Sequence, residues 1–596
     1  MGKVTFTKRS FASGELSSRI HQSRNDLQIH SQGFAYSLNL VPLQSGALVH
    51  RPRTISYPNL SLPLGSRRLI PFYSTGDTHV LLVFGHKTLS FVKIEGGEHP
   101  NIAQDDITTP YSGSVAETLS YAISGNLMIL AHPNHPPYQL EVTDKGFNFR
   151  IMKFSPPPWL GNGVVGGDSV DAKLRIIIPK NNKDEEGEYG VEAIGGDVFK
   201  ASDKGRFLRL GFTPKAWRAE TKYSEKSFIY MYGKIYQSTQ GGTSGAKWFD
   251  NTKDAFISDG SINWKVVASA QSITSPRYGK QTTTTTAEPI PSYYVWGCIT
   301  NVKNSKKVVI KLNPSFILHD EEPTRLWNLS AWGSKEGYPK TVTFYQNRLV
   351  FSGTESDASS LYLSEYRKYN YFSPDGEYGS PDYLKALSVA VTDDVLREIR
   401  WMTPMEHGLL VGCDSSLWLL CIDLDNGFNI VTRRISGSGV ASCPALSVGD
   451  SILFVCGAGR KIKAVSGGIE QGFKFKDVTQ FVDHLFTFQV KQMIYQEDPY
   501  SLIWIIDKST PGAYKSYNLL GCRFTSEEET EFAWHAHKIG GDMAILSLAT
   551  FPSIDRGETD FWMLAMRRTN DSYKVVLERL DCFHLSHNYL ADGTDA

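Results

Sequence analysis

The amino-acid sequence predicts a mainly β protein with a β-propeller-like core, an inserted β-rich domain and a short N-terminal helix. Three observations support this fold class: a recurring two-strand pattern, the spacing of its copies, and one long interruption of that rhythm. In each copy a run of apolar residues is followed by a turn and a second apolar strand, which is typical of a β-hairpin. Seven such hairpins occur, at residues 79–94, 126–142, 347–365, 408–422, 451–465, 501–519 and 543–568.

The spacing of the hairpins favours a propeller. Within each run of copies, the hairpins start roughly 40 to 60 residues apart, which suits the four strands of a propeller blade. The copies share this period but little residue identity, so a large all-β protein built from unrelated hairpins stays open as the alternative. The pattern does not fix the number of blades.

The interruption of the rhythm predicts an inserted domain. It starts with the sequence PPPWLGNGVVGGDS and ends with KQTTTTTAEPIP, and clusters of Pro, Gly and Thr are typical of linkers. Between these linkers, KLRIIIP, RFLRLGF, SFIYMYGKIYQS and INWKVVASAQ have the composition of strands. We therefore expect three parts: residues 1–155 with the first blades, residues 156–291 as the inserted domain, and residues 292–596 with the remaining blades and a C-terminal segment.

The N-terminal helix is predicted from Ser13 to about Asn25. Ser13 is a candidate N-cap, and Glu15 falls in the first helical turn. Leu16 and Ile20 are four residues apart, so they share one face of a short amphipathic helix.

Residues 324–374 form the stretch around which the other hairpins are organised. A strand with two tryptophans, ending near Trp332, precedes a turn at Gly337, Tyr338 and Pro339. The sequence TVTFYQNRLVFSG then reads as one strand, and LYLSE reads as a second strand that pairs back on RLVFSG.

Composition and charge narrow the functional classes. The 596 residues include 62 basic and 62 acidic side chains, and a formal net charge of zero argues against a protein that grips nucleic acid by counterion release. Seven cysteines without CxxC spacing indicate free thiols from a reducing compartment. The N-terminus lacks the apolar block of a signal peptide, and no apolar run approaches the roughly 18 residues of a spanning helix, so we expect a soluble chain.

One short motif is similar to a carbohydrate-enzyme signature. The sequence ISDGSINW at residues 257–264 is similar to the sialidase Asp box, which separates its Asp from its Gly by one residue. Here Asp259 and Gly260 are adjacent, which favours a hairpin turn.

Two histidine pairs have spacings that a metal could use: His132 with His135, and His535 with His537. No carboxylate or cysteine accompanies them, which favours turn or solvent-facing histidines. The chain also lacks a phosphate-binding G-x-x-x-x-G-K loop and a G-x-S-x-G nucleophile motif. We therefore predict no catalytic residues, no cofactor and no metal site, and expect that the protein is not an enzyme.

Several sequence motifs follow one another over almost the whole chain. They are GELS at 14–17, RPRT at 51–54, VFKASDKGRFLRL at 198–210, the stretch 324–374, FAWHAHKIGG at 532–541 and VVLERL at 575–580. The residues that we single out from them as structural are Gly14, Glu15, Leu16, Arg51, Pro52, Trp332, Gly337, Tyr338, Pro339 and Arg348.

In this order the motifs resemble those of the tail nozzle, or tail tubular protein B, family of short-tailed bacteriophages (podoviruses). Ser18 stands where the family often has proline, and Arg53 replaces its usual glycine. The resemblance implies a structural virion protein that forms a homo-hexamer below the tail adaptor (tail tubular A) ring. It further implies a conduit and gate for DNA ejection, without sequence-specific DNA binding, and a seat for tail fibres or tailspikes that meets the host envelope at infection. The expected location is the virion tail, after assembly in the bacterial cytoplasm.

Two other functions stay open. A propeller enzyme that degrades surface polysaccharide is suggested by the near Asp box and the 12% aromatic content. A receptor-binding tail protein is the third possibility.

Overall fold

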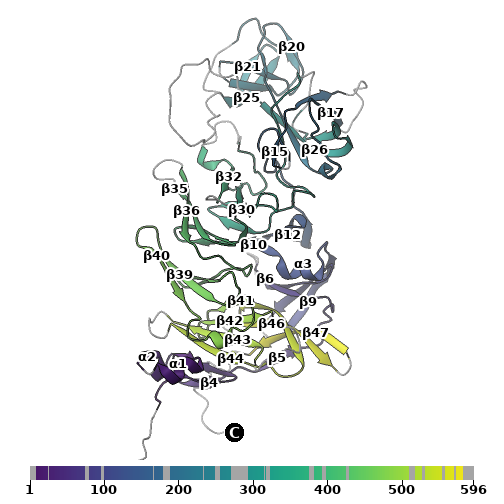
Figure 1. The fold of residues 1–596 in the computed structure, drawn as a ribbon. Coiled ribbons are helices and arrows are strands. Elements are labelled where there is room, and N and C mark those ends of the chain that lie inside the picture. The colour runs from purple at the N-terminus through teal and green to yellow at the C-terminus, as the bar shows by residue number, and fades with distance from the viewer. Residues whose placement is uncertain are drawn as a thin grey trace, which may run out of the picture.

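The computed structural model describes residues 8–24, 26–73, 79–95, 99–165, 167–178, 188–232, 234–248, 256–269, 293–314, 316, 322–374, 382–391, 397–423, 429–508, 517–525, 531–553, 557–569 and 572–581. In these residues the chain forms a seven-bladed β-propeller with an inserted β-rich unit, which lies at the top of Figure 1. The short N-terminal helices α1 (Ser18–Ser23) and α2 (Gln28–Gln32) lie at the opposite end. The mainly β, propeller-like fold predicted from the hairpin rhythm is confirmed.

Each blade contains four antiparallel strands, which follow sequence order except for the closing strand of blade 7, and in blade 6 two short N-terminal strands extend the sheet in parallel. Blade 1 consists of β6 (Arg68–Tyr73), β7 (His79–Phe84), β8 (Thr88–Glu95) and β9 (His99–Thr108). Blade 2 consists of β10 (Ser120–Ser124), β11 (Leu127–His132), β12 (His135–Thr143) and β13 (Gly146–Ile151), and is preceded by helix α3 (Gly113–Thr118). Blade 3 consists of β29 (Val342–Tyr345), β30 (Arg348–Ser352), β31 (Ser360–Leu363) and β32 (Leu387–Ala390).

The second half of the chain supplies the other four blades. Blade 4 consists of β33 (Ile399–Met405), β34 (Gly408–Cys413), β35 (Leu417–Asp423) and β36 (Asn429–Ser436). Blade 5 consists of β37 (Leu446–Val448), β38 (Ser451–Val455), β39 (Ile462–Gly468) and β40 (Gly472–Asp477). Blade 6 consists of β41 (Val490–Gln496), β42 (Leu502–Asp507), β43 (Leu519–Phe524) and β44 (Phe532–His537). Blade 7 consists of β45 (Met543–Pro552), β46 (Thr559–Thr569), β47 (Ser572–Leu580) and the N-terminal strand β5 (Thr54–Tyr57).

The hydrophobic core of the ring lies between the blades. Each pair of neighbouring blades encloses its own cluster of buried apolar side chains, including the pair formed by blades 7 and 1. Inner strands also pack in succession, for example β41 against β45 and β45 against β6. Burial on both faces of each sheet explains why the predicted hairpins are nearly continuous apolar runs.

The N-terminal segment closes the ring. Strand β5 pairs with β47, so blade 7 is built from the two ends of the described chain. Upstream of it, β1 (Gly14–Glu15) and β2 (Gly33–Phe34) extend blade 6 beyond β44, and β3 (Leu40–Pro42) pairs with β4 (Leu48–His50). Three strands that precede blade 1 in the sequence, β1, β2 and β5, therefore belong to the sheets of blades 6 and 7.

Six of the seven predicted hairpins are present at their predicted positions. Five of them are the central strand pair of a blade, and the hairpin at 543–568 is the first pair of blade 7. In the hairpin predicted at 501–519, β42 is present, but its partner β43 begins only at Leu519, and residues 509–516 lie outside the described residues. The prediction of one strand for the sequence TVTFYQNRLVFSG was wrong, because the structure has two strands there, β29 and β30. Gln346 and Asn347 have φ values of 45° and 56° and make the two-residue turn between them, a conformation for which asparagine is favoured over most other non-glycine residues.

The inserted unit contains two larger sheets. The first has the order β16-β17-β27-β26-β18-β28, with β16 (Lys173–Ile177), β17 (Glu188–Ile194), β27 (Lys307–Leu312), β26 (Tyr293–Asn304), β18 (Phe207–Phe212) and β28 (Trp327–Leu329). The second has the order β19-β21-β22-β25-β24, with β19 (Lys215–Ala216), β21 (Phe228–Met231), β22 (Lys234–Ser238), β25 (Ile262–Ser269) and β24 (Phe256–Asp259). Two short pairs, β14 (Val164–Val165) with β15 (Asp168–Ser169) and β20 (Lys222–Tyr223) with β23 (Gly242–Thr243), complete the unit.

The inserted unit extends further than the sequence suggested. Strands β26, β27 and β28 were assigned to the propeller by a boundary at residue 291, but they pair with β17 and β18 of the insertion. The insertion therefore ends after Leu329, and the predicted strand with two tryptophans crosses this boundary. The Thr-rich linker at 280–291 lies outside the described residues.

The N-terminal helix is shorter than predicted. It begins at Ser18, its N-cap is Ser17, and no side chain caps it. Ser13 and Glu15 are therefore not a cap and a first-turn residue. Gly14 and Glu15 form β1 instead, because their backbones pair with both β2 and β44. No helix in the described part of the chain is long and apolar enough to cross a membrane.

Candidate functional site

The motif GELS attaches the N-terminal segment to blade 6. Gly14 has a φ of +72°, and a Cβ atom at this position would lie 2.6 Å from both the backbone N and O of Trp534. Only glycine fits such a close approach without displacing the strand. Trp534 belongs to the motif FAWHAHKIGG, so two motifs from opposite ends of the chain meet here.

Glu15 holds this attachment from the buried side. Its side chain is 2% exposed, and its Oε1 lies 2.9 Å from Nε2 of His484 in the 3-10 turn η4 (Asp483–Leu485). The backbone N–H of Ser37 donates to Oε2 over 3.3 Å. A buried carboxylate needs such partners, so Glu15 is a structural anchor.

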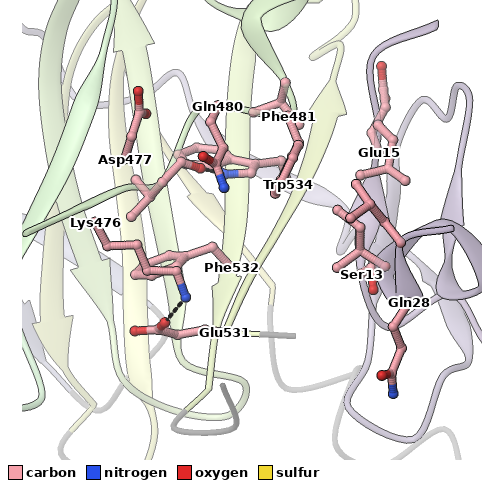
Figure 2. A pocket seen from close by; sticks show the side chains of 15 residues that line it. Ser13, Glu15, Gln28, Lys476, Asp477, Gln480, Phe481, Glu531, Phe532 and Trp534 are labelled. Atoms are coloured by element: carbon pink, nitrogen blue, oxygen red, sulfur yellow. Dashed lines mark hydrogen bonds and ion pairs between the residues drawn. The ribbon is translucent and has the colours of Figure 1, made fainter. Parts of the chain in front are cut away.

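A cavity of about 290 Å³ lies between the N-terminal segment and the outer strands of blades 5 and 6. In Figure 2, Ser13, Glu15 and Gln28 lie on one side, and Phe532, Trp534 and the Lys476–Glu531 ion pair lie on the other. We call this cavity the strap groove. Its further lining residues are Leu16, Leu27, Ile29, Asp477, Val478, Gln480, Phe481 and Val482.

The strap groove has the chemistry of a binding site for an apolar group. Aromatic rings form one wall, and an ion pair stands beside them. The hydroxyl of Ser13 is buried and has no hydrogen-bond partner in the described residues. The lining residues include the carboxylates of Glu15, Asp477 and Glu531 and the amine of Lys476, but no histidine or cysteine.

Arg51 and Pro52 stand at the ring closure. The Arg51 guanidinium donates to the backbone oxygen of Pro52 over 2.7 Å and to Thr54 Oγ1 over 3.2 Å, and burial lowers the pKa of Arg51. Arg53, which replaces the family's usual glycine, forms an ion pair with Asp581 at 2.9 Å. The motif RPRT thus meets the end of the motif VVLERL, because β5 pairs with β47.

A buried ion network joins the inserted unit to the propeller. Nη1 of Arg206 lies 2.8 Å from Asp203 Oδ1 and 2.8 Å from Glu336 Oε1, and Nη2 donates to the backbone oxygen of Ser330. All three charged side chains are at most 5% exposed. This network links the motif VFKASDKGRFLRL to the stretch 324–374, and no spacing in the sequence indicates it.

The other motif residues of 324–374 shape the turn beside this network. Trp332 is 6% exposed and packs edge-to-face against Phe351 in blade 3. Gly337 has a φ of +82° and exchanges two backbone hydrogen bonds with Gly333. The N–H of Tyr338 donates to the backbone oxygen of Pro133 in blade 2, and burial raises the pKa of the Tyr338 hydroxyl. Pro339 is buried as well.

Arg348 stabilises the interior of blade 3. It is 2% exposed, and its guanidinium donates to the backbone oxygens of Ser364, Lys385 and Tyr383. Burial lowers the pKa of Arg348 to about 10, which leaves the side chain charged at neutral pH. Three neutral carbonyl acceptors make this arginine a structural brace.

Asp259 is a structural residue as well. The hairpin turn predicted for Asp259 and Gly260 is confirmed, with Gly260 at a φ of +61°. The Asp259 carboxylate is 1% exposed and accepts hydrogen bonds from the indole N–H groups of Trp217 and Trp264 and from the backbone N–H of Gly245. Asp259 therefore stabilises the second sheet of the insertion, to which β24 and β25 belong.

The two histidine pairs differ from each other. His132 and His135 flank the turn between β11 and β12, as predicted. His535 and His537 are fully buried in β44, so the prediction of turn or solvent-facing histidines was wrong for them. Burial lowers the pKa of His535 to about 3 and that of His537 well below its usual value, which leaves two neutral imidazoles in contact with each other.

The cysteines and the metal-binding side chains add no further site. Cys413 and Cys421 are not opposite each other in their hairpin, as predicted, and the six described cysteines are free thiols. In the described ranges, no group of three or more His, Cys, Asp or Glu side chains is placed to hold a metal.

Comparison with known proteins does not identify a family. No family model matches the chain, and no curated protein matches it. Among solved structures, BBS1N in complex with ARL6DN is similar with a TM-score of 0.26 and 8% identity, over 77% of this chain and 94% of that chain. Saccharomyces cerevisiae Dbp5 bound to Nup159 and Gle1, with IP6 and ADP, is similar with a TM-score of 0.22 and 9% identity, over 47% of this chain and 70% of that one. Scores this low carry no functional argument, and the fold assignment rests on the sheet topology described above.

Proposed function

We propose that this chain is a structural subunit of the tail of a short-tailed bacteriophage, where it forms the nozzle. In this role six copies ring the tail axis below the adaptor, form a conduit and gate for the ejected DNA, and seat fibres or spikes. The proposal starts from the ordered motifs that resemble the nozzle family.

The observation that carries the proposal is the pairing of these motifs in space. GELS packs against FAWHAHKIGG, RPRT lies beside VVLERL, and VFKASDKGRFLRL is joined to the stretch 324–374 by the Arg206 network. The paired motifs therefore form the joints of the fold: the N-terminal attachment, the ring closure and the base of the insertion. The motif residues thus stabilise the contacts between parts of the fold, which is the role expected of motif residues in a structural subunit.

The physical character of the molecule supports the same role. A ring subunit needs rigid faces toward two neighbours, and a closed propeller with a separate core between each pair of blades supplies them. A DNA conduit must not hold phosphates strongly, and the balanced charge of the chain agrees with that requirement. The near Asp box suggested a polysaccharide-degrading enzyme. Its Asp259 carboxylate instead accepts hydrogen bonds from Trp217 and Trp264, so no described contact favours that alternative.

The test is assembly with the adaptor. The full chain is mixed with the purified adaptor ring of its phage, and the particles are analysed by size and by electron microscopy. We expect a second ring of six propellers on the distal face of the adaptor. A chain that never joins the adaptor, at any concentration tested, contradicts the proposal, and release of sugar from host capsule or lipopolysaccharide favours the enzyme instead.

A further inference from the structure

The outermost strand of blade 1 forms an acidic face. Strand β9 is an edge strand, so its outer side has no neighbouring strand in the sheet. Asp105 and Asp106 are exposed on it, and Ile102 beside them is 46% exposed. We define the acidic face as these three residues.

The outermost strands of blades 4 and 5 form a basic face. Strand β36 exposes Arg433 beside Val431, which is 44% exposed, and β40 exposes Lys474 beside Phe475, which is 37% exposed. We define the basic face as these four residues. Each face therefore combines charge of one sign with an exposed apolar side chain, and the two faces are opposite in charge.

The charges on the two faces have no ion-pair partners within the described residues. Asp105, Asp106, Arg433 and Lys474 take part in none of the ion pairs there, whereas Lys476, two residues along β40, is paired with Glu531. Charges that are already paired within the chain gain little from a partner. The four unpaired side chains can form new ion pairs with opposite charges on another molecule.

The two faces lie on opposite sides of the ring. In blade order, blades 2 and 3 separate blade 1 from blade 4, and blades 6 and 7 separate it from blade 5. Figure 1 shows β9 on the right of the propeller and β36 and β40 on the left. A molecule with complementary surfaces on opposite sides can bind copies of itself head to tail, and such contacts produce a closed ring when the rotation per subunit allows it.

From this geometry we infer that the acidic face on blade 1 of one copy binds the basic face on blades 4 and 5 of the next copy. The inference rests on the proposed function, since it names the surfaces by which the subunits of the ring contact one another. Asp105 and Asp106 pair with Arg433 and Lys474 of the neighbour, and Ile102 packs near Val431 and Phe475. The open edges of β9, β36 and β40 are thereby covered, which removes the aggregation hazard of exposed edge strands.

The test is a charge swap in the full chain. The double variant Asp105→Lys, Asp106→Lys has two basic faces, and the double variant Arg433→Glu, Lys474→Glu has two acidic faces. We expect each variant alone to assemble at least about tenfold more weakly than the wild type, because every contact becomes repulsive. An equal mixture of the two should recover assembly, since acidic and basic copies can alternate around the ring. Sedimentation, with and without the adaptor, measures both effects.

The matched control changes the charge by the same amount on the inserted unit. Lys173→Glu with Lys215→Glu alters two exposed cations there and should assemble like the wild type. If both charge-swap variants assemble as well as this control, the interface assignment is wrong while the nozzle function stands. If the wild type joins no ring even with the adaptor, the proposed function fails, and the interface fails with it.

Discussion

At the scale of single residues, Gly14 is the position where the fold tolerates the least change. A Cβ atom there would overlap the backbone of Trp534, and the positive φ adds strain for any other residue. We expect Gly14→Ala to cost more than about 2 kcal/mol and to loosen the N-terminal segment from blade 6. Hydrogen exchange in residues 14–34 measures this loosening. Gly540→Ala is the control, because nothing lies within 4 Å of its added Cβ.

His132 makes the stability of blade 2 sensitive to acid. Burial, together with His135 and Lys340, lowers the pKa of His132 to about 4, below the usual value of an unfolded histidine. The neutral ring is thus the stable form, and its Nδ1 accepts the backbone N–H of Asn134. The stabilisation is complete above about pH 6.5 and is lost as the pH falls toward 4, because the unfolded chain then binds a proton that the folded chain excludes.

A comparison with His132→Asn checks this contribution. The midpoint of thermal unfolding should fall more steeply for the wild type than for the variant between pH 6.5 and 4. Between pH 6.5 and 4, the free energy of unfolding should fall by at most about 3 kcal/mol more in the wild type than in the variant. Parallel curves would show that His132 does not contribute to the acid sensitivity.

At the scale of structural elements, the joint between β18 and the turn at 333–337 depends on the buried Arg206 network. Glu336→Ala removes one of the two carboxylates that contact the buried Arg206 guanidinium, while Asp203 stays paired with it. We expect a cost of about 1.5 to 3 kcal/mol, the usual worth of a hydrogen bond between charged groups. Glu336→Gln, which keeps an oxygen acceptor, should cost less. Lys335→Ala, at an exposed neighbour, should be close to neutral. Equal unfolding midpoints for Glu336→Ala and Lys335→Ala would contradict the role of the network.

The same joint shows which parts of the structure the sequence could predict. Hairpins are local, so their apolar runs and turns were sufficient to identify six of the seven at their positions. The boundary of the insertion was missed because β26 and β27 pair with strands that are far away in the chain. The Arg206–Glu336 contact spans 130 residues and leaves no spacing signal. His535 and His537 were misplaced because polar residues in a strand give no indication that both of its faces are covered.

The strap groove was not predicted from the sequence. The motif residues Glu15 and Leu16 line it, and Gly14 pairs with Gly33 beside it. The resemblance marked them as important, but it did not reveal that their partners are Trp534 and His484. Those contacts depend on the ring closure, which brings the two ends of the chain to neighbouring blades.

At the scale of the whole molecule, the two ends of the chain lock the ring. Deletion through Tyr57 removes β5, β1 and β2, which exposes the edge of β47 and opens the strap groove. We expect this truncation to lower the unfolding midpoint of the entire propeller and to promote aggregation. Deletion through Arg9 leaves every one of these strands in place and is the control. A long truncation that unfolds like the short one would mean that the ring closes without its N-terminal strand.

The ring closure also has a consequence for biosynthesis. A nascent chain carries β5 out of the ribosome long before β47, its partner in blade 7, has been translated. Blades 1 to 6 can form in succession as they emerge, but the circle stays open until the last residues of blade 7 appear. A product that terminates early therefore leaves an incomplete arc with two bare edges, which marks it for quality control before it can enter a larger assembly.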